Sequence, residues 1–122
     1  MQLISPEKIF RGNGAWLKAL PHIKKVSRRP LILGRSLSTY DIRQQIHKDL
    51  QDENLSIYSS KLKFDCCYED LKRIRNIILK NNCDSIIAIG GGKVLDSGKF
   101  LADSLSIPVI TIPLSASTCA GW

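Results

Sequence analysis

Histidines, aromatic residues and metal-ligand spacings are scarce in this sequence of 122 residues. It contains two histidines, His22 and His47, and aromatic residues make up 7% of the chain. The histidines do not form an HxxxH-type arrangement, and the four cysteines show neither a CxxC pair nor a zinc-site spacing. These absences exclude a catalytic metal site assembled from this chain alone.

Long apolar runs are absent as well. No run is long enough to span a bilayer, and the N-terminus has no apolar signal-peptide core. We therefore expect a cytoplasmic protein without a membrane partner, in which Cys66, Cys67, Cys83 and Cys119 are reduced. The length fits a single domain with a modest core.

Acidic residues are fewer than basic ones, 11 against 18, and the formal net charge is +7. A basic chain admits polyanionic partners, including nucleic acid. However, the densest basic run, from Lys24 to Arg29, has no interleaved aromatic residues and no nucleic-acid motif. We expect a solvated basic surface and no nucleic-acid partner, with part of the charge helping to attract a phosphorylated cofactor.

The most informative stretch is SIIAIGGGKVLDSGK, residues 85–99. Its apolar start is typical of a buried strand, and the residues after Gly92 have the spacing of an amphipathic helix. Between them, Gly90, Gly91 and Gly92 allow a sharp turn and a close approach to the bare backbone. A strand, a glycine turn and a helix point backbone N–H groups at one spot, which favours a phosphate. The glycines match neither GxGxxG nor the P-loop pattern, so taken alone they also fit a structural tight turn.

Two further features strengthen the prediction of a ligand site here. Asp96 and Lys99 are neighbours on one helix face, and we expect Asp96 in the first turn, where the helix dipole favours a carboxylate. In isolation this pair also fits a solvated surface pair. A second apolar run, residues 107–113, leads into the polar residues 115–118. Two strands therefore end in small or polar turns, and ligands bind at such carboxyl ends in open α/β sheets.

Helical and apolar segments alternate along the chain. Strands are predicted at 30–33, 55–58, 85–89 and 107–113, with a loop at 59–65. Helices are predicted near 16–23, interrupted by Pro21, then from about 38 to 50, from 68 to 78, and after the glycine turn, where Phe100 shares the buried face. Gly12 and Gly14 indicate a turn. The alternation predicts an α/β fold, a Rossmann-like parallel sheet with helices on both faces.

Three segments together resemble a known family. GGGKVLDSGK at 90–99, PVITIPLSAST at 108–118 and RGNGA at 11–15 are similar to motifs of the metal-dependent, iron- or zinc-containing alcohol dehydrogenases, especially the glycerol dehydrogenase branch. The resemblance covers nearly the whole chain. It implies a dehydroquinate synthase-like N-terminal domain that binds NAD or NADP, and a small alcohol or polyol as substrate.

The resemblance also implies roles for particular residues. The pyrophosphate would be held by Gly90, Gly91, Gly92, Lys93 and Val94, with Asp96 and Lys99 near the nicotinamide side. Leu114, Ser115 and Ser117 would border the cofactor, and Cys119 would lie by the substrate. Two positions depart from the family: Cys119 stands where an Asp contacts the polyol, and Leu114 stands where a Thr is usual.

The turn after the first strand bears on cofactor preference. Dinucleotide sites commonly place a carboxylate there for the adenosine ribose, whereas this chain has Gly34, Arg35 and Ser36. Arg35 could contact a 2′-phosphate, which would favour NADP. A solvent-exposed turn arginine is the alternative.

By resemblance, residues 1–122 form the NAD(P)-binding domain of a glycerol-type dehydrogenase and stop before the helical domain that carries the zinc or iron ligands. We expect a catalytically incomplete chain with no metal ligands of its own. A face meant for another domain would then be exposed, which makes a homo-oligomer plausible. Two alternatives stay open: a non-catalytic nucleotide-binding remnant, and the N-terminal domain of a dehydroquinate synthase-like enzyme.

Overall fold

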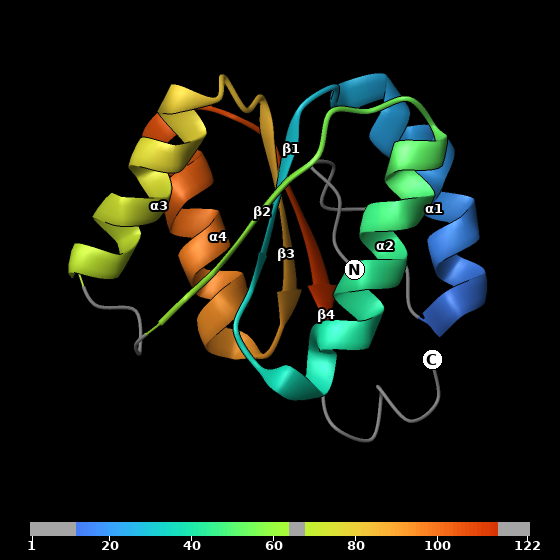
Figure 1. The fold of residues 1–122 in the computed structure, drawn as a ribbon, viewed down its shortest axis with the longest axis horizontal. Helices are drawn as coiled ribbons and strands as arrows, with labels where there is room; N and C mark the ends of the chain where they lie inside the picture. Colours follow the sequence, from blue (N-terminus) through green and yellow to red (C-terminus); the bar gives the residue numbers. More distant parts are fainter. Residues whose placement is uncertain (1–11, 64–67, 115–122) are drawn as a thin grey trace.

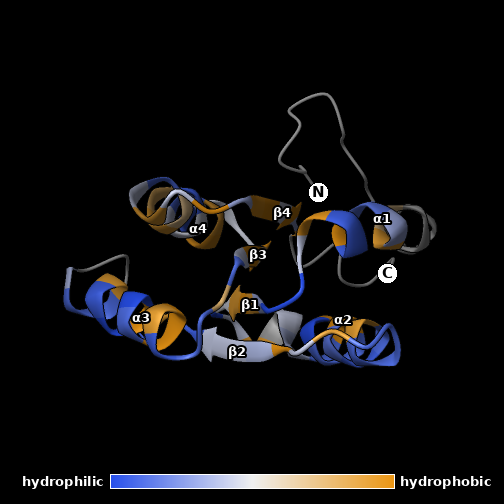
Figure 2. Ribbon diagram, turned by 90° about the horizontal axis from the view of Figure 1, so that it is seen from above, coloured by the Kyte–Doolittle hydropathy of each residue, from blue (hydrophilic) through white to orange (hydrophobic). Residues whose placement is uncertain are grey.

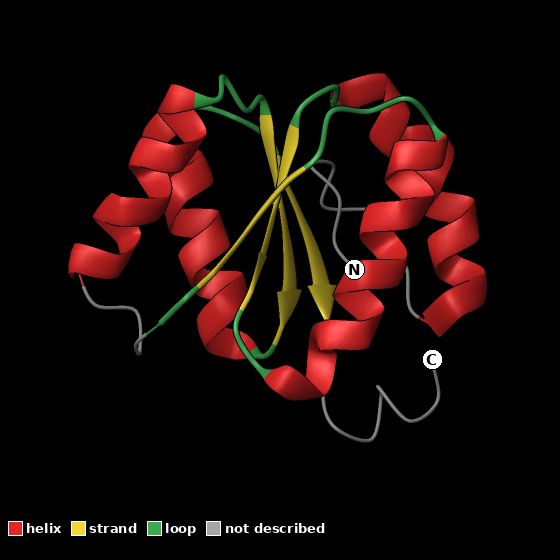
Figure 3. Cartoon of the chain, in the orientation of Figure 1, coloured by secondary structure: helices red, strands yellow, loops and turns green. Residues whose placement is uncertain are grey.

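The computed structural model describes residues 12–63 and 68–114, which form one sheet covered by helices (Figures 1 and 3). Along the chain the elements are α1 (Gly12–Val26), β1 (Pro30–Gly34), the 3-10 turn η1 (Leu37–Thr39), α2 (Tyr40–Asp52), β2 (Tyr58–Lys61), α3 (Tyr68–Lys80), β3 (Ser85–Gly90), α4 (Gly92–Leu105) and β4 (Val109–Pro113). The predicted alternation of helices and strands is confirmed.

The four strands within these described ranges form a parallel sheet in the order β2-β1-β3-β4. β1 pairs with β2 on one side and with β3 on the other, and β3 pairs with β4. Every residue of β1 and of β3 is buried, because both faces of the sheet are covered and both strands are almost wholly apolar. The predicted α/β fold with a parallel sheet is therefore confirmed.

The helices cover the sheet from both faces, as the view in Figure 2 shows. On one face α1 and α2 contribute Ala19, Leu20, Ile23, Ile42, Ile46 and Leu50 to a core with Ile32, Ile87, Ile89, Ile110, Ile112 and Leu114. On the other face α3 and α4 contribute Ile74, Ile78, Val94, Leu101 and Ala102 to a core with Leu31, Leu33, Leu62, Cys83, Ile86 and Ala88. Alternate side chains of the central strands thus fill two separate cores.

The second strand lies three residues later than the sequence predicts. We expected it at 55–58 with a loop from Ser59, but β2 runs from Tyr58 to Lys61. Leu55 and Ile57 pack against the core without joining the sheet. The polar sequence of β2 hid it, because an edge strand has one solvated side and needs little apolar character.

The first helix is longer than predicted. It begins at Gly12, where we expected a turn, and continues through Pro21, where we expected an interruption. Pro21 lies on the exposed side, and the buried face formed by Ala19, Leu20 and Ile23 is continuous across it. Burial of that face offsets the single backbone hydrogen bond that a proline removes.

Side chains link the loops at the amino edge of the sheet. One carboxylate, that of Asp84, accepts hydrogen bonds from the backbone N–H groups of Arg28 (2.9 Å) and Arg29 (3.0 Å). The hydroxyls of Ser27 and Ser85 are also hydrogen-bonded to each other. The basic run of the sequence therefore ends at the amino edge, away from the carboxyl ends of the strands.

Candidate functional site

The carboxyl ends of β1 and β3 mark the point where the chain changes direction across the sheet. β1 leads through α2 to β2 on one side, and β3 leads through α4 to β4 on the other. Because α2 packs on one face and α4 on the opposite face, the two connections diverge there. Open α/β sheets bind their ligands at such a switch point, outside the carboxyl ends of the strands.

The glycine turn lies at this switch point, and its three glycines have different reasons to be glycine. Gly90 has φ +145°, a conformation that other residues rarely adopt, and its carbonyl accepts a hydrogen bond from the Leu114 N–H (2.9 Å). Gly91 has ordinary extended dihedral angles (φ −84°, ψ −174°). Within the described ranges, a Cβ added at Gly91 or Gly92 would meet no atom within 4 Å apart from its immediate chain neighbours and nearby helix backbone. Of the three glycines of this turn, the described part of the fold therefore requires glycine at Gly90, and among the described residues the space above Gly91 and Gly92 is open.

Helix α4 begins beside this open space without a side-chain cap. The first hydrogen bond inside the helix joins the Leu95 N–H to the Gly91 carbonyl (3.1 Å). The earlier N–H groups of a first turn have no partner within their own helix and point outward along its axis. Val94 is 4% exposed and fixes this turn on the sheet. The arrangement can bind an anion through backbone groups.

The predicted position of Asp96 in the first turn is wrong. Asp96 is the fifth residue of α4, which begins at Gly92, so the dipole argument does not apply to it. Asp96 and Lys99 are both exposed on the helix. Phe100, which we expected on the buried face, is 61% exposed, while its neighbour Leu101 is 1% exposed. Phe100 therefore lies on the exposed face of α4 and Leu101 on the buried face, so the apolar pattern assigned Phe100 to the wrong face.

Sequence reasoning missed the role of Gly98. A Cβ added there would lie 2.7 Å from the Ala88 Cβ, so α4 approaches β3 more closely than a larger residue allows. The Ser97 hydroxyl in the same turn donates to the Lys93 carbonyl (2.8 Å). The available signal was a pair of small residues, Ala88 in an isoleucine-rich strand and Gly98 in the following helix. Close packing of this kind holds the glycine turn in place.

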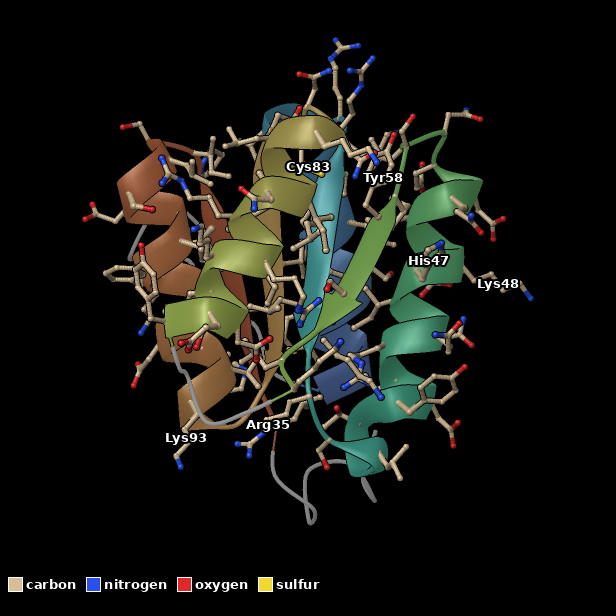
Figure 4. The ribbon with its side chains drawn as sticks, turned by 60° about the vertical axis from the view of Figure 1, so that its left-hand side comes forward. Arg35, His47, Lys48, Tyr58, Cys83 and Lys93 are labelled. Atoms are coloured by element: carbon tan, nitrogen blue, oxygen red, sulfur yellow. The ribbon has the colours of Figure 1, made fainter. Side chains whose placement is uncertain are left out.

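The other predicted site residues lie in three different settings. Arg35 and Lys93 follow β1 and β3 and lie at the same end of the molecule (Figure 4). Leu114 is 7% exposed, and its side chain lies in the core beside α1 and α2. Ser115, Ser117 and Cys119 lie outside the described residues. The structure thus brings Arg35, Lys93 and the glycine turn to one edge.

A second arginine at this edge was not predicted. Arg43, in the first turn of α2, is 9% exposed and lies directly against Gly34, where a Cβ would overlap its side chain. Its Nη1 donates to the Ser36 carbonyl (3.0 Å) and to the Thr39 hydroxyl (2.7 Å). Burial lowers the pKa of Arg43, and the charge of the Tyr40 phenol group partly opposes this effect. The Arg43 guanidinium also lies 6.0 Å from the centroid of the Tyr40 ring. Helical periodicity marked Ile42 and Ile46 as the buried positions and gave no signal for the arginine.

The described residues do not fit a metal ion. Among them, no group of three or more histidine, cysteine or acidic side chains lies close enough to hold one. His47 contacts the Ser59 hydroxyl through Nδ1 (3.0 Å), and Cys83 is buried at the opposite end from Arg35 and Lys93. Burial raises the pKa of Cys83 to about 11, with Asp84 adding to the shift, so its thiol is not a ready metal ligand.

The described part of the chain also has no helix that could cross a membrane.

The fold and the site define a class: an open, parallel α/β domain with a glycine turn at its switch point. Residues 6–122 match the family model described as iron-containing alcohol dehydrogenase, and the chain belongs to this family. It is similar to a glycerol dehydrogenase of Escherichia coli, with 29% identity over 95% of this chain and 32% of that protein. It is also similar to a glycerol-1-phosphate dehydrogenase (NAD(P)+) of Nitrosopumilus maritimus, with 33% identity over 95% of this chain and 31% of that protein.

Solved structures agree on the fold. The glycerol dehydrogenase of Schizosaccharomyces pombe has a TM-score of 0.72 at 22% identity, over 88% of this chain and 29% of that chain. The described sheet and helices are therefore shared with that enzyme. The chain spans about 30% of the length of these three relatives.

Proposed function

We propose that residues 1–122 form the NAD(P)-binding domain of an alcohol or polyol dehydrogenase acting on a glycerol-type substrate. The observation that carries the proposal is the open space over Gly91 and Gly92, beside the uncapped start of α4. Neither glycine is required by its backbone angles or its neighbours, so a ligand that needs close approach to the backbone explains both.

The names of two relatives support the same proposal. One is a glycerol dehydrogenase, and the other is a glycerol-1-phosphate dehydrogenase whose name includes NAD(P)+. Both are oxidoreductases acting on a three-carbon polyol or its phosphate. A nicotinamide cofactor and a small hydroxylated substrate are therefore the ligand classes we propose for this chain.

In this proposal the chain's own residues bind and orient the cofactor. First-turn N–H groups of α4 bind the pyrophosphate, and Gly91 and Gly92 let it approach. The side chains of Lys93 and Arg35 add positive charge at the same edge. A bound nicotinamide cofactor would supply the acceptor for the hydride removed from the alcohol carbon. The described residues do not fit zinc or iron, so no step is assigned to a metal.

The cofactor-proximal residues at the end of the chain belong to the same proposal. We place Ser115 and Ser117 beside the cofactor and Cys119 beside the substrate, as the family resemblance implies. Leu114 would contribute through its backbone, because its side chain lies in the core. Asp96 and Lys99 would contact the ligand from the exposed side of α4.

Calorimetric titration of the chain with NAD(H) and NADP(H), beside Gly91→Val, tests this proposal. The introduced side chain would occupy the open space, and its Cβ would touch no described atom beyond its two chain neighbours. We therefore expect the fold to persist and the affinity for the cofactor to fall at least tenfold. Asp103→Val, an exposed change near the other end of α4, is the matched control and should leave binding unchanged.

Two results would contradict the proposal. Equal affinity of Gly91→Val and the parent chain would show that the pyrophosphate does not use the glycine turn. A folded parent chain that binds neither cofactor would show that these residues do not form an NAD(P) site on their own.

A further inference from the structure

A small hollow lies between α2 and the edge strand β2, on the β1 side of the proposed cofactor site. Its volume is about 200 Å³, and it is lined by Ile32, Tyr40, Arg43, Gln44, Ser59, Ser60 and Lys61. Arg43 is in the first turn of α2 and Lys61 is the last residue of β2. Lys61 pairs with Gly34 at the carboxyl end of β1, and Arg43 lies against Gly34, so this end of the hollow lies at the same edge of the sheet as the glycine turn.

The charge of Arg43 is not balanced by any partner in the described part of the chain. Its contacts are the Ser36 carbonyl, the Thr39 hydroxyl and the Tyr40 ring, and none of these carries a negative charge. A cation that is 9% exposed and has only neutral partners is costly, because burial strips it of water. Both hydrogen bonds that Arg43 makes to described residues use Nη1, which leaves its other guanidinium N–H groups as donors for a ligand in the hollow as far as the described residues go.

A second cation, the side chain of Lys61, lines the same hollow. Ser59 and Lys61 point toward α2, since the Ser59 hydroxyl contacts His47 and alternate residues of a strand share a face. Ser60 points the other way, toward α3, where its hydroxyl accepts a hydrogen bond from Arg73 (3.2 Å). Arg73 also donates to the Lys61 carbonyl (2.6 Å), which fixes the backbone under the Lys61 side chain.

We propose that this hollow binds a phosphomonoester, and specifically the 2′-phosphate of NADP, through Arg43 and Lys61. The inference rests on the proposed dinucleotide site. A phosphomonoester carries close to two negative charges, and a guanidinium binds it through paired N–H groups while a lysine adds a point charge. Arg35, in the turn between the hollow and the glycine turn, would contact the same nucleoside.

The sheet order gives the correct separation for one nucleoside. β1 lies between β3, which carries the glycine turn, and β2, which carries Lys61. Neighbouring strands are about 5 Å apart, so the two positions are separated by about 10 Å across the edge. A pyrophosphate at α4 therefore leaves its adenosine over β1 and places the ribose substituent at the hollow.

The test compares NAD with NADP, which differ only in the 2′-phosphate, on the parent chain, Lys61→Met and Arg43→Met. We expect the parent to prefer NADP, and each variant to lose about tenfold or more in NADP affinity while NAD affinity changes less than about twofold. Lys61 is exposed, so its variant should fold even if Arg43→Met does not. The matched control is Lys48→Met, which changes an exposed lysine that lies on α2 and does not line the hollow.

Smaller probes separate the nucleotide from free phosphate. Adenosine 2′,5′-bisphosphate should bind more tightly than 5′-AMP, and the difference should vanish in Lys61→Met. Inorganic phosphate that binds as tightly as the bisphosphate would overturn the assignment to NADP. Equal parent affinities for NAD and NADP would overturn this inference alone, whereas failure of both cofactors to bind would overturn the proposed function with it.

Discussion

Two glycines of α4 have different reasons to be glycine. Gly98 is required by the packing of the fold, whereas Gly92 leaves room for a ligand. A Cβ added at Gly92 would meet no atom within 4 Å, whereas a Cβ at Gly98 would lie 2.7 Å from the Ala88 Cβ. Both glycines are helical, so both gain helix propensity when changed to alanine. Only the second change forces α4 away from β3.

We therefore expect the same substitution to be destabilising at Gly98 but not at Gly92. Gly92→Ala should leave the free energy of unfolding unchanged or raise it by up to about 1 kcal/mol. Gly98→Ala should lower it by about 1–3 kcal/mol through overpacking. Urea denaturation of the two variants beside the parent chain measures both, and a Gly98→Ala variant as stable as the parent would contradict the close approach.

The buried thiol of Cys83 makes stability depend on alkaline pH. Burial raises its pKa to about 11, from an ordinary value near 9. A raised folded-state pKa stabilises the fold fully below the unfolded value, and the stabilisation is lost as pH rises from about 9 to about 11. A difference of this size is on the order of 3 kcal/mol.

Cys83→Ala isolates this effect from other groups that titrate in the same range. Between about pH 9 and about pH 11 we expect the parent chain to lose up to about 3 kcal/mol more stability than the variant does. Denaturant unfolding at several pH values measures the difference. Parallel pH profiles for the two chains would show that the thiol titrates normally.

At the scale of elements, an ion pair within α3, between Asp70 and Arg73, anchors this helix to the end of the edge strand through hydrogen bonds to its backbone. Asp70 is 2% exposed, and its carboxylate accepts hydrogen bonds from Arg73 Nη2 (2.7 Å) and the Lys63 N–H (2.6 Å). Arg73 in turn donates to the Lys61 carbonyl (2.6 Å). The short, polar strand β2 is held in place by these side chains as well as by its pairing with β1.

Removing the arginine should leave a buried charge poorly compensated. We expect Arg73→Met to lower the free energy of unfolding by about 3 kcal/mol, since the buried Asp70 carboxylate then loses the cation that pairs with it. Arg75→Met, an exposed change on the same helix, should stay within about 0.5 kcal/mol of the parent. Thermal unfolding followed by circular dichroism distinguishes them, and equal effects would contradict a structural role for the pair.

At the scale of the whole molecule, cofactor binding should stabilise the fold. A ligand present at about 100 times its dissociation constant adds about 2.7 kcal/mol, which raises the Tm of a domain of this size by roughly 10 °C. We expect this shift with NADP for the parent chain and little shift for Gly91→Val. Differential scanning fluorimetry measures it, and an equal shift in both would place the bound cofactor away from the glycine turn.

The sequence predicted the parallel α/β fold because Ile86 to Ile89 and the alternating helices carry strong apolar patterns. It also located the glycine turn. It misplaced β2, whose stability comes from Arg73 and from pairing with β1 rather than from its own composition. It missed Arg43 and Gly98, because each depends on a contact with a residue distant along the chain or on another element. Arg43 left no local signal in the sequence, and the signal for Gly98 was limited to the small residues Ala88 and Gly98 in neighbouring elements.

The two edges of the sheet differ in what their residues do. Those at the amino edge bond to one another, and those at the carboxyl edge form the proposed ligand sites. Asp84 and Ser85 link the loops at the amino edge through side-chain hydrogen bonds, while the carboxyl edge carries the glycine turn, Arg35 and the hollow at Arg43. Changes in ligand specificity can therefore accumulate at the carboxyl edge without weakening the bonds at the amino edge. A lineage carrying this domain could exchange one cofactor for another by a few substitutions and keep its fold.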